Sequence, residues 1–94
     1  MSYQVELRHL RYFQVLAEEL NFRKASERLF IAQPGLSRQI KQLEEILDAQ
    51  LFTRTKRSVK LTTAGMYLKE EVDRILNQLD LAKKQTALIH QGDF

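Results

Sequence analysis

The amino-acid sequence predicts a mainly α-helical fold in which three short helices and a small two-stranded β wing precede one long helix. Apolar residues recur at three- and four-residue steps on both sides of a central segment, as on the buried faces of helices. The central segment, residues 51–61, instead has two short stretches of strand character joined by a basic turn. A chain of 94 residues can form one small core but not two.

The first two helices are short. One face of a predicted helix over roughly 6–20 is lined by Leu7, Leu10, Phe13, Ala17 and Leu20. Asn21 can end this helix and cap a second one over about 22–30. The residues expected to point inward from the second helix are Phe22, Ala25 and Leu29.

A third helix is predicted over 33–47. Pro34 falls in its first turn, where a missing N–H group is tolerated. Its expected buried stripe consists of Leu36, Ile40, Leu43 and Leu47. Only a short break at Ile31 and Ala32 separates it from the second helix, so the two form a helix-turn-helix candidate.

Residues 51–54 and 58–61 are predicted to pair as a hairpin. Their turn lacks the Asn-Gly pair of tight hairpins, and a lone hairpin is marginally stable, so the strands must pack on the helices. The segment 53–60 carries four basic residues and no acid. Such a patch can attract a polyanion, although a solvated basic loop is the alternative. Three helices followed by a hairpin form a winged helix-turn-helix.

Thr62 is a suitable N-cap for a fourth helix that runs to about His90 and ends at Gly92. A heptad seam on this helix is formed by Leu68, Val72, Ile75, Leu79, Ala82, Thr86 and Ile89. Such a helix extends about 42 Å, whereas the preceding residues form a ball roughly 25–30 Å across. The helix therefore outruns its own domain, and we expect its seam to pair with a second copy of the chain in a homodimer. A helix folded back on its own core would explain Leu68 and Val72 only.

Composition and charge limit the classes of protein. The chain has no cysteine, no signal-peptide pattern at its start and no apolar run near the roughly 20 residues of a membrane span. We therefore expect a cytoplasmic protein without a membrane partner. The net charge is only +3, but residues 1–62 carry eleven Lys and Arg against seven Asp and Glu, while residues 63–94 carry four against five. The positive charge thus lies in the predicted winged domain.

The face of the third helix opposite its apolar stripe has no acidic residue before Glu44. This face presents Gln33, Pro34, Gly35, Ser37, Arg38, Lys41 and Gln42. A helix that enters the DNA major groove needs donors and small residues of this kind near its N-terminus. Gly35 allows the backbone to approach DNA closely, while Arg38 and Lys41 suit phosphates or guanine. An ordinary solvated helix face is the alternative.

The wing supplies a second candidate contact. Arg54, Lys56 and Arg57 lie on or beside its turn. An arginine there can enter a narrow, electronegative minor groove. A basic loop just after an acid-poor helix favours DNA binding more strongly than either feature does alone.

Several motifs occur in the order found in LysR-type transcriptional regulators. The chain resembles the N-terminal region of that family at Leu10-Arg-Tyr-Phe13, Ala25-Ser-Glu-Arg-Leu29, Gln33-Pro-Gly-Leu-Ser-Arg-Gln-Ile40, Leu43-Glu44, Leu51-Phe52-Thr-Arg54 and Leu61-Thr-Thr-Ala-Gly65. Each motif is weak, but their order over residues 7–66 is specific.

The resemblance implies that the third helix, 33–47, enters the major groove and that the wing, 53–60, lies at the minor groove. By position, the family's recognition-helix contacts fall on Gln33, Pro34, Gly35, Ser37 and Arg38, and its wing contacts fall on Arg54 and Arg57. The fourth helix resembles the linker helix that pairs two subunits.

Three positions depart from the family pattern. Ala32 stands where a capping Ser or Thr is common, a loss of about 1 kcal/mol for the third helix. Ser26 replaces a common alanine but stays small. Asp48 stands where glycine is usual, and Asp tolerates a left-handed backbone better than most residues. None of these changes removes a proposed DNA contact.

The resemblance also implies a division of the chain. Residues 1–62 form the DNA-binding domain, 63–91 the linker helix, and 92–94 the start of a hinge to an effector domain. We expect a truncated regulator that binds an interrupted inverted repeat of double-stranded DNA without responding to an inducer. The intact protein can form tetramers in this family, and no cofactor or metal is expected.

Other classes of function fit less well. An enzyme is not expected, because His9 and His90 lie far apart and the chain has neither a metal motif nor a glycine-rich phosphate loop. The rival interpretation is a helical dimerisation or protein-interaction module without sequence-specific DNA readout. RNA binding is a third possibility, but RNA readers usually expose aromatic residues. Here Phe13, Phe22 and Phe52 fall on predicted inward positions.

Overall fold

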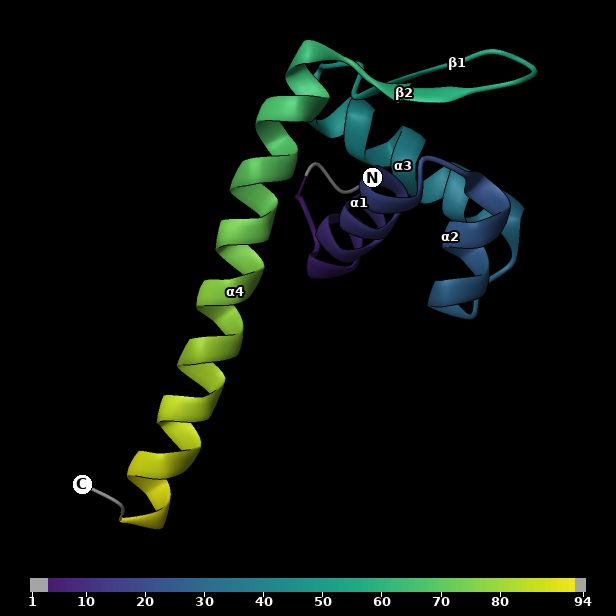
Figure 1. Ribbon diagram of the computed structural model, residues 1–94. Helices are drawn as coiled ribbons and strands as arrows, with labels where there is room; N and C mark the ends of the chain where they lie inside the picture. Colours follow the sequence, from purple (N-terminus) through teal and green to yellow (C-terminus); the bar gives the residue numbers. More distant parts are fainter. Residues whose placement is uncertain (1–3, 93–94) are drawn as a thin grey trace.

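The computed structural model describes residues 4–92 and confirms the predicted fold class (Figure 1). Its elements in chain order are α1 (Leu7–Glu19), α2 (Phe22–Leu29), α3 (Gln33–Leu47), β1 (Phe52–Arg54), β2 (Val59–Leu61) and α4 (Thr63–Gln91). The strands pair antiparallel, with Phe52 opposite Leu61 and Arg54 opposite Val59. The predicted boundaries of the elements are therefore close to the observed ones.

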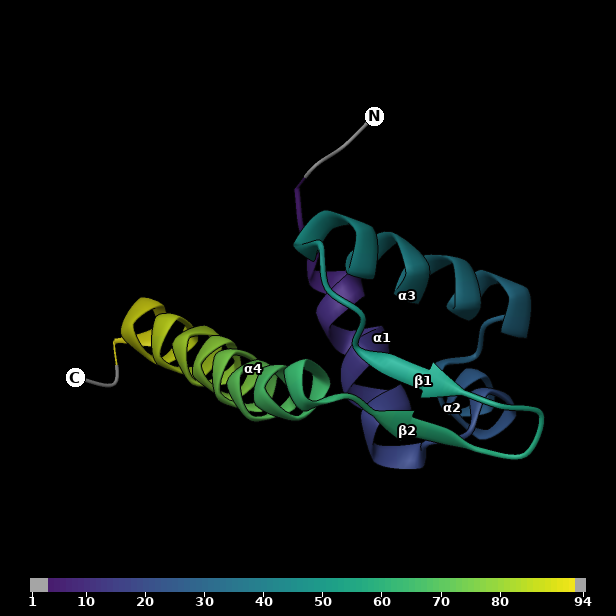
Figure 2. The same cartoon turned by 90° about the horizontal axis from the view of Figure 1, so that it is seen from above.

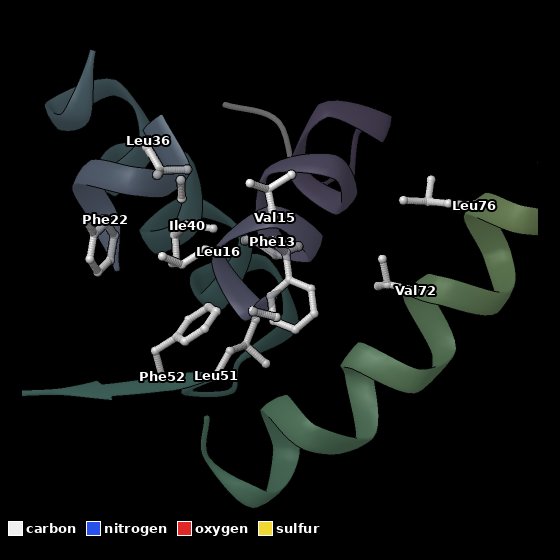
Figure 3. Packing of buried hydrophobic residues seen from close by; sticks show 13 residues of the cluster. Phe13, Val15, Leu16, Phe22, Leu36, Ile40, Leu51, Phe52, Val72 and Leu76 are labelled. Atoms are coloured by element: carbon white, nitrogen blue, oxygen red, sulfur yellow. The ribbon is translucent and has the colours of Figure 1, made fainter. Parts of the chain in front are cut away.

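One hydrophobic core lies between α1 and the elements packed around it (Figure 3). Its fully buried side chains include Phe13, Leu16, Leu36, Leu43 and Val72. The ring of Phe13 packs against that of Phe52, with the two centroids 5.5 Å apart. The root of the wing is thereby joined to the helical core, as the marginal stability of a lone hairpin requires.

α1 buries a broader face than the single predicted stripe. Val15 and Leu16, outside that stripe, are buried, whereas Leu7 and Leu20 at the two ends are exposed. α1 packs against α2, α3 and α4, so its middle is covered from several sides while its ends stay open. Leu47 is exposed as well, contrary to prediction, because it is the last residue of α3.

Both turns that flank α2 are fixed by local hydrogen bonds. Asn21 Oδ1 accepts from the Lys24 N–H at 2.8 Å, which confirms the predicted cap. Leu20 and Phe30 take left-handed backbone conformations at the ends of α1 and α2. The Ile31 N–H then donates to the Ser26 carbonyl at 3.1 Å. These bonds set the direction in which α3 starts.

His9 connects the start of α1 to α3 from a buried position. Its Nδ1 accepts from the Glu6 N–H at 2.9 Å, so Nε2 carries the hydrogen and donates to Gln42 Oε1 at 2.7 Å. Gln42 therefore turns toward α1. Gln42, which the sequence placed on the exposed face of the third helix, is only half-exposed, because its amide oxygen accepts from the buried imidazole.

The wing and α4 are joined through the backbone around Leu51. The Thr62 N–H donates to the Leu51 carbonyl at 2.9 Å, and Glu44 Oε2 accepts from the Leu51 N–H at 2.7 Å. Thr62 Oγ1 accepts from the Gly65 N–H at 3.0 Å and donates to the Gln50 carbonyl at 2.6 Å. Thr62, the predicted N-cap of α4, thus also hydrogen-bonds α4 to the segment before β1.

α4 starts inside the domain and then leaves it. Gln14 Nε2 donates to Asp73 Oδ1 at 2.8 Å, and Lys69 Nζ pairs with Asp73 Oδ2 at 3.1 Å. The bond from Gln14, assisted by Lys69, holds the pKa of the Asp73 carboxyl below its usual range. From Asp80 to Gly92 every residue is exposed. The molecule extends 54 Å along its long axis and 27 Å across it, with the wing turn and the end of α4 pointing in opposite directions (Figures 1 and 2).

Not every residue of the predicted dimer seam is available to a partner. Val72 is fully buried against the domain, and Leu76, which the predicted seam omitted, is buried beside it (Figure 3). A fully buried side chain has no surface left for a second chain, so including Val72 in the interface was wrong. The core therefore continues past residue 62 into the first half of α4. Of the predicted hinge, residues 92–94, only Gly92 lies within the described residues.

Within residues 4–92, no helix is long and apolar enough to cross a membrane.

Candidate nucleic-acid interface

The start of α3 forms an open, acid-free surface. Six predicted contact residues are at least partly exposed on it: Gln33, Pro34, Gly35, Ser37, Arg38 and Lys41. Leu36 and Ile40 are buried on the opposite side, so α3 has one apolar face and one polar face. Ala32 offers no side-chain cap, as predicted, and a Cβ added to Gly35 would meet nothing within 4 Å. A flat surface can therefore approach this end of the helix closely.

The tip of the wing is held by one hydroxyl group that sequence reasoning did not single out. Thr55 Oγ1 accepts from the N–H groups of Arg57 and Ser58, both at 3.2 Å. The Thr55 N–H donates to the Ser58 carbonyl at 2.9 Å and closes the turn. A threonine that bonds the backbone two residues ahead makes such a turn without Asn-Gly. Lys56 and Arg57 project from this ordered turn as exposed cations.

Arg54 is the last residue of β1, beside the wing turn, and is held by two neighbours. Its guanidinium carbon lies 4.4 Å from the centroid of the Phe22 ring. Its Nη1 donates to Ser37 Oγ at 3.2 Å. The predicted contact residues Arg54 and Ser37 are therefore in direct contact, although 17 positions separate them.

A hollow separates the wing from the helix-turn-helix. Its lining includes Leu20, Asn21, Phe22, Arg23, Gln33 and residues 55–59. Gln33 of α3 and Arg57 of the wing thus face the same space, and Arg23 of α2 adds a third polar side chain to it. The exposed Arg23 side chain also pairs with Glu27 at 3.2 Å. Arg23 could not be found from the spacing of residues in α2, because only the wing position brings it to this surface.

Other charged groups are occupied away from this surface. Arg28 donates to Glu18 and Glu19, each at 2.9 Å, and ties α2 to the end of α1. The hydrogen bond to Glu18, followed by that to Glu19, raises the pKa of Arg28. The arginine is therefore balanced by two carboxylates, in contrast to the acid-free start of α3.

The predicted dimer residues divide into two groups. Val72 is buried and Leu68 is half-buried against the domain's own core. The remaining five have exposed or half-exposed side chains on α4 and are Ile75, Leu79, Ala82, Thr86 and Ile89. Their role in an interface stays a prediction.

A model of bacterial regulatory helix-turn-helix proteins of the LysR family matches residues 7–66. The regulator CatR of Pseudomonas putida is 52% identical over 88 residues, which are 94% of this chain and 30% of that protein. An uncharacterized helix-turn-helix regulator of Escherichia coli K12, YnfL, is 48% identical over 89 residues, 95% of this chain and 30% of its own length. The chain thus spans about a third of the length of these curated relatives.

Solved structures show the same architecture. The DNA-binding domain of BenM, in complex with the catB site 1 DNA, superposes with a TM-score of 0.92 at 44% identity, over 96% of this chain and 97% of that one. The DNA-binding domain of CbnR, also in a DNA complex, gives a TM-score of 0.88 at 34% identity, over 92% and 99% of the two chains. The likeness includes the long helix, because both matches cover more than nine tenths of the chain.

Proposed function

Because the chain belongs to the LysR family of bacterial helix-turn-helix regulatory proteins, we propose that it binds double-stranded DNA sequence-specifically, as the N-terminal part of a transcriptional regulator. The observation that supports this most directly is the position of the wing beside the start of α3. Gln33 and the wing turn line one hollow, and Arg54 is bonded to Ser37. The start of α3 and the basic turn therefore lie side by side, and Glu44 is the acidic residue in the neighbouring hollow lined by Ser37, Lys41 and Arg54.

In this proposal, α3 enters the major groove and the wing lies at the adjacent minor groove. The α3 residues assigned to base edges and phosphates are Gln33, Pro34, Gly35, Ser37, Arg38 and Lys41. The wing residues assigned to DNA are Arg54, Lys56 and Arg57. Arg57 and Lys56 are best suited to the minor groove, because the Thr55 turn presents them at the tip.

The exposed part of α4 is assigned to self-association. A two-fold homodimer presents two equivalent recognition helices, which suits an interrupted inverted repeat. Ile75, Leu79 and Ile89 supply apolar surface beyond the domain's own core. Thr86 Oγ1 donates to the Ala82 carbonyl at 2.7 Å, so its polar group is satisfied within the helix and its methyl group can face an apolar partner.

The organisation of the longer protein is part of the same proposal. Residues 1–62 are the DNA-binding part, 63–91 the linker helix, and the segment from 92 leads toward a domain outside this chain. The relatives are about three times as long as the matched region, which supports that division. We place the regulator in the cytoplasm, with tetramers possible for the full-length protein and no catalytic role.

Selection of the chain against random-sequence duplexes at about 150 mM salt tests the proposal, because that salt screens weak charge-only binding. We expect enrichment of an inverted repeat. The double variant Arg38→Ala/Arg57→Ala should lose affinity for that repeat while its oligomeric state stays unchanged. Arg28→Ala removes the same kind of charge outside the surface and should retain affinity. Recovery of no DNA would instead favour the protein-interaction module.

A further inference from the structure

Three side chains from three different elements meet where β1 enters the wing turn. Phe22 begins α2, Ser37 lies in the second turn of α3, and Arg54 ends β1. Phe22 is buried, with 8% of its surface exposed, whereas Arg54 is exposed. The ring therefore forms a fixed support, and Arg54 lies across it at 4.4 Å.

This support restricts where Arg54 can go. A free arginine has many rotamers, but a guanidinium stacked on a buried ring and bonded to Ser37 at 3.2 Å has few. Fixing the charge before DNA arrives reduces the ordering that binding would otherwise require. The sequence assigned Phe22 to the core only. That its ring also contacts Arg54 becomes apparent only once β1 lies beside α2.

The contact also sets the hydrogen-bond direction of Ser37. Its Oγ accepts from Arg54, which leaves the Ser37 O–H able to donate outward. Arginine has only donors. The Arg54–Ser37 pair therefore presents N–H and O–H donors together with a full positive charge, which suits a phosphate oxygen.

The place of the pair between α3 and the wing tip points to the same ligand. If α3 occupies the major groove and the tip, at Lys56 and Arg57, reaches the minor groove, the sugar-phosphate backbone between the two grooves must pass between α3 and that tip. Arg54, the last residue of β1, is bonded to α3 there, whereas Lys56 and Arg57 lie two and three residues farther along the wing turn.

We propose that Phe22 is a positioning residue that holds Arg54 against Ser37, so that the pair clamps one backbone phosphate between the two grooves. This proposal rests on the proposed DNA binding. It separates the three wing cations into two roles: Arg54 binds backbone charge, and Lys56 and Arg57 face the minor groove. Phe22 acts through Arg54 and does not itself touch DNA.

The salt dependence of binding to the selected duplex tests the role of Phe22. Phe22→Leu keeps an apolar side chain but removes the ring, and we expect about 5-fold weaker binding. The slope of log K against log salt should fall by up to about 0.9, the value of one phosphate contact. Phe22→Tyr keeps the ring and should restore both quantities. Thermal unfolding of each variant establishes that binding is measured on folded protein.

A double-mutant cycle separates positioning from a general structural role. In an Arg54→Gln background the clamp is already lost, so Phe22→Leu should change affinity no further. An equal loss in both backgrounds would overturn the proposal, as would an unchanged salt slope in Arg54→Gln. If the unmodified chain bound no duplex specifically, the proposed function itself would fail. Specific binding by the unmodified chain with no coupling between residues 22 and 54 would overturn only the clamp.

Duplexes that carry single neutral methylphosphonates locate the phosphate. At one position in each half-site, neutralising the phosphate should weaken binding by the unmodified chain but leave binding by the Arg54→Gln variant unchanged. That position should lie between the bases protected by α3 and those protected by the wing. Loss of preference for A·T-rich flanks in Arg54→Gln, without such a position, would place Arg54 in the minor groove and contradict the assignment.

Discussion

The first turns of α3 and α4 are similar in sequence but opposite in environment. Each helix has glycine as its third residue, Gly35 in α3 and Gly65 in α4. At α4 the turn is capped by Thr62, and a Cβ on Gly65 would lie 2.1 Å from the Leu51 carbonyl oxygen. At α3 the cap is missing at Ala32, and a Cβ on Gly35 would meet nothing within 4 Å.

This contrast separates a helix start that holds the fold together from one that is left accessible. The start of α4 is where the wing, α3 and the last helix meet, so Thr62 is bonded on two sides. At the start of α3, Pro34 has no N–H and the Gly35 N–H donates to the Ala32 carbonyl at 3.0 Å, while the open space beside Gly35 leaves this end of the helix accessible. The same residue type therefore serves close packing in one helix and close approach by a ligand in the other.

The largest expected effect comes from Gly65→Ala. The added methyl group would collide with the backbone at Leu51 and with Leu61, so the joint between wing and helix must move. We expect a loss of about 3 kcal/mol of unfolding free energy, the upper range for overpacking. Urea denaturation followed by circular dichroism measures it. Retention of full stability would mean that the joint adapts easily.

Gly35→Ala is the matched substitution in α3. Because the position is open, alanine should leave stability unchanged or raise it by up to about 1 kcal/mol, the usual gain over glycine within a helix. Under the proposed function, the same methyl group obstructs DNA and weakens specific binding. A parallel loss of stability in both glycine variants would remove the contrast between the two helices.

Thr62→Val tests the cap of α4 at nearly constant side-chain size. Valine lacks the oxygen that accepts from Gly65 and the hydrogen that is donated to Gln50. We expect a loss of about 1–2 kcal/mol, typical of a lost N-cap. The midpoint of urea unfolding should fall with little change in slope.

Ala32→Ser makes the opposite change in α3. A serine at this position can accept from the N–H groups of the first turn, as Thr62 does in α4. We expect about 1 kcal/mol of added stability, seen as a rise in Tm of roughly 5 °C. An unchanged Tm would indicate that the local backbone does not allow the cap to form.

Most of the fold was predictable because its signals are local. Helix periodicity placed every helix, and the caps at Asn21 and Thr62 and the left-handed Asp48 were all confirmed. The prediction failed where one sequence pattern is compatible with two different packing partners. One heptad seam fits both the face of α4 that packs on its own domain and the face left exposed, so Val72 was assigned to the wrong one.

The candidate site was predictable only in part, for a related reason. Exposed residues of α3 follow directly from its apolar stripe, which identified Arg38 and Lys41. Phe22 and Arg23 reach the same surface only because the wing folds back beside α2. Thr55 gave a weak signal, since a threonine in a turn is common and its bonds to Arg57 and Ser58 depend on the loop geometry.

The smallest expected effect concerns how firmly α4 stays attached beyond its first turns. The pKa of Asp73 is lowered in the folded chain, chiefly by the bond from Gln14, so this group stabilises the fold above the ordinary Asp value of about 3.9. That contribution is lost as pH falls through the lowered pKa. Because the side chain is 37% exposed, solvent screening limits it to less than about 1 kcal/mol.

Asp73→Asn should therefore be slightly less stable than the unmodified chain at neutral pH, and the difference should vanish under acid conditions. Gln14→Ala removes the same bond from the α1 side and should give the same pH dependence, since it releases the pKa of Asp73 toward its ordinary value. Urea midpoints measured from pH 7 down to pH 2 record both curves. A constant difference across this range would show that the two variants act through packing of α4 on α1, and that α4 is held to the domain by its apolar face and its first turn alone.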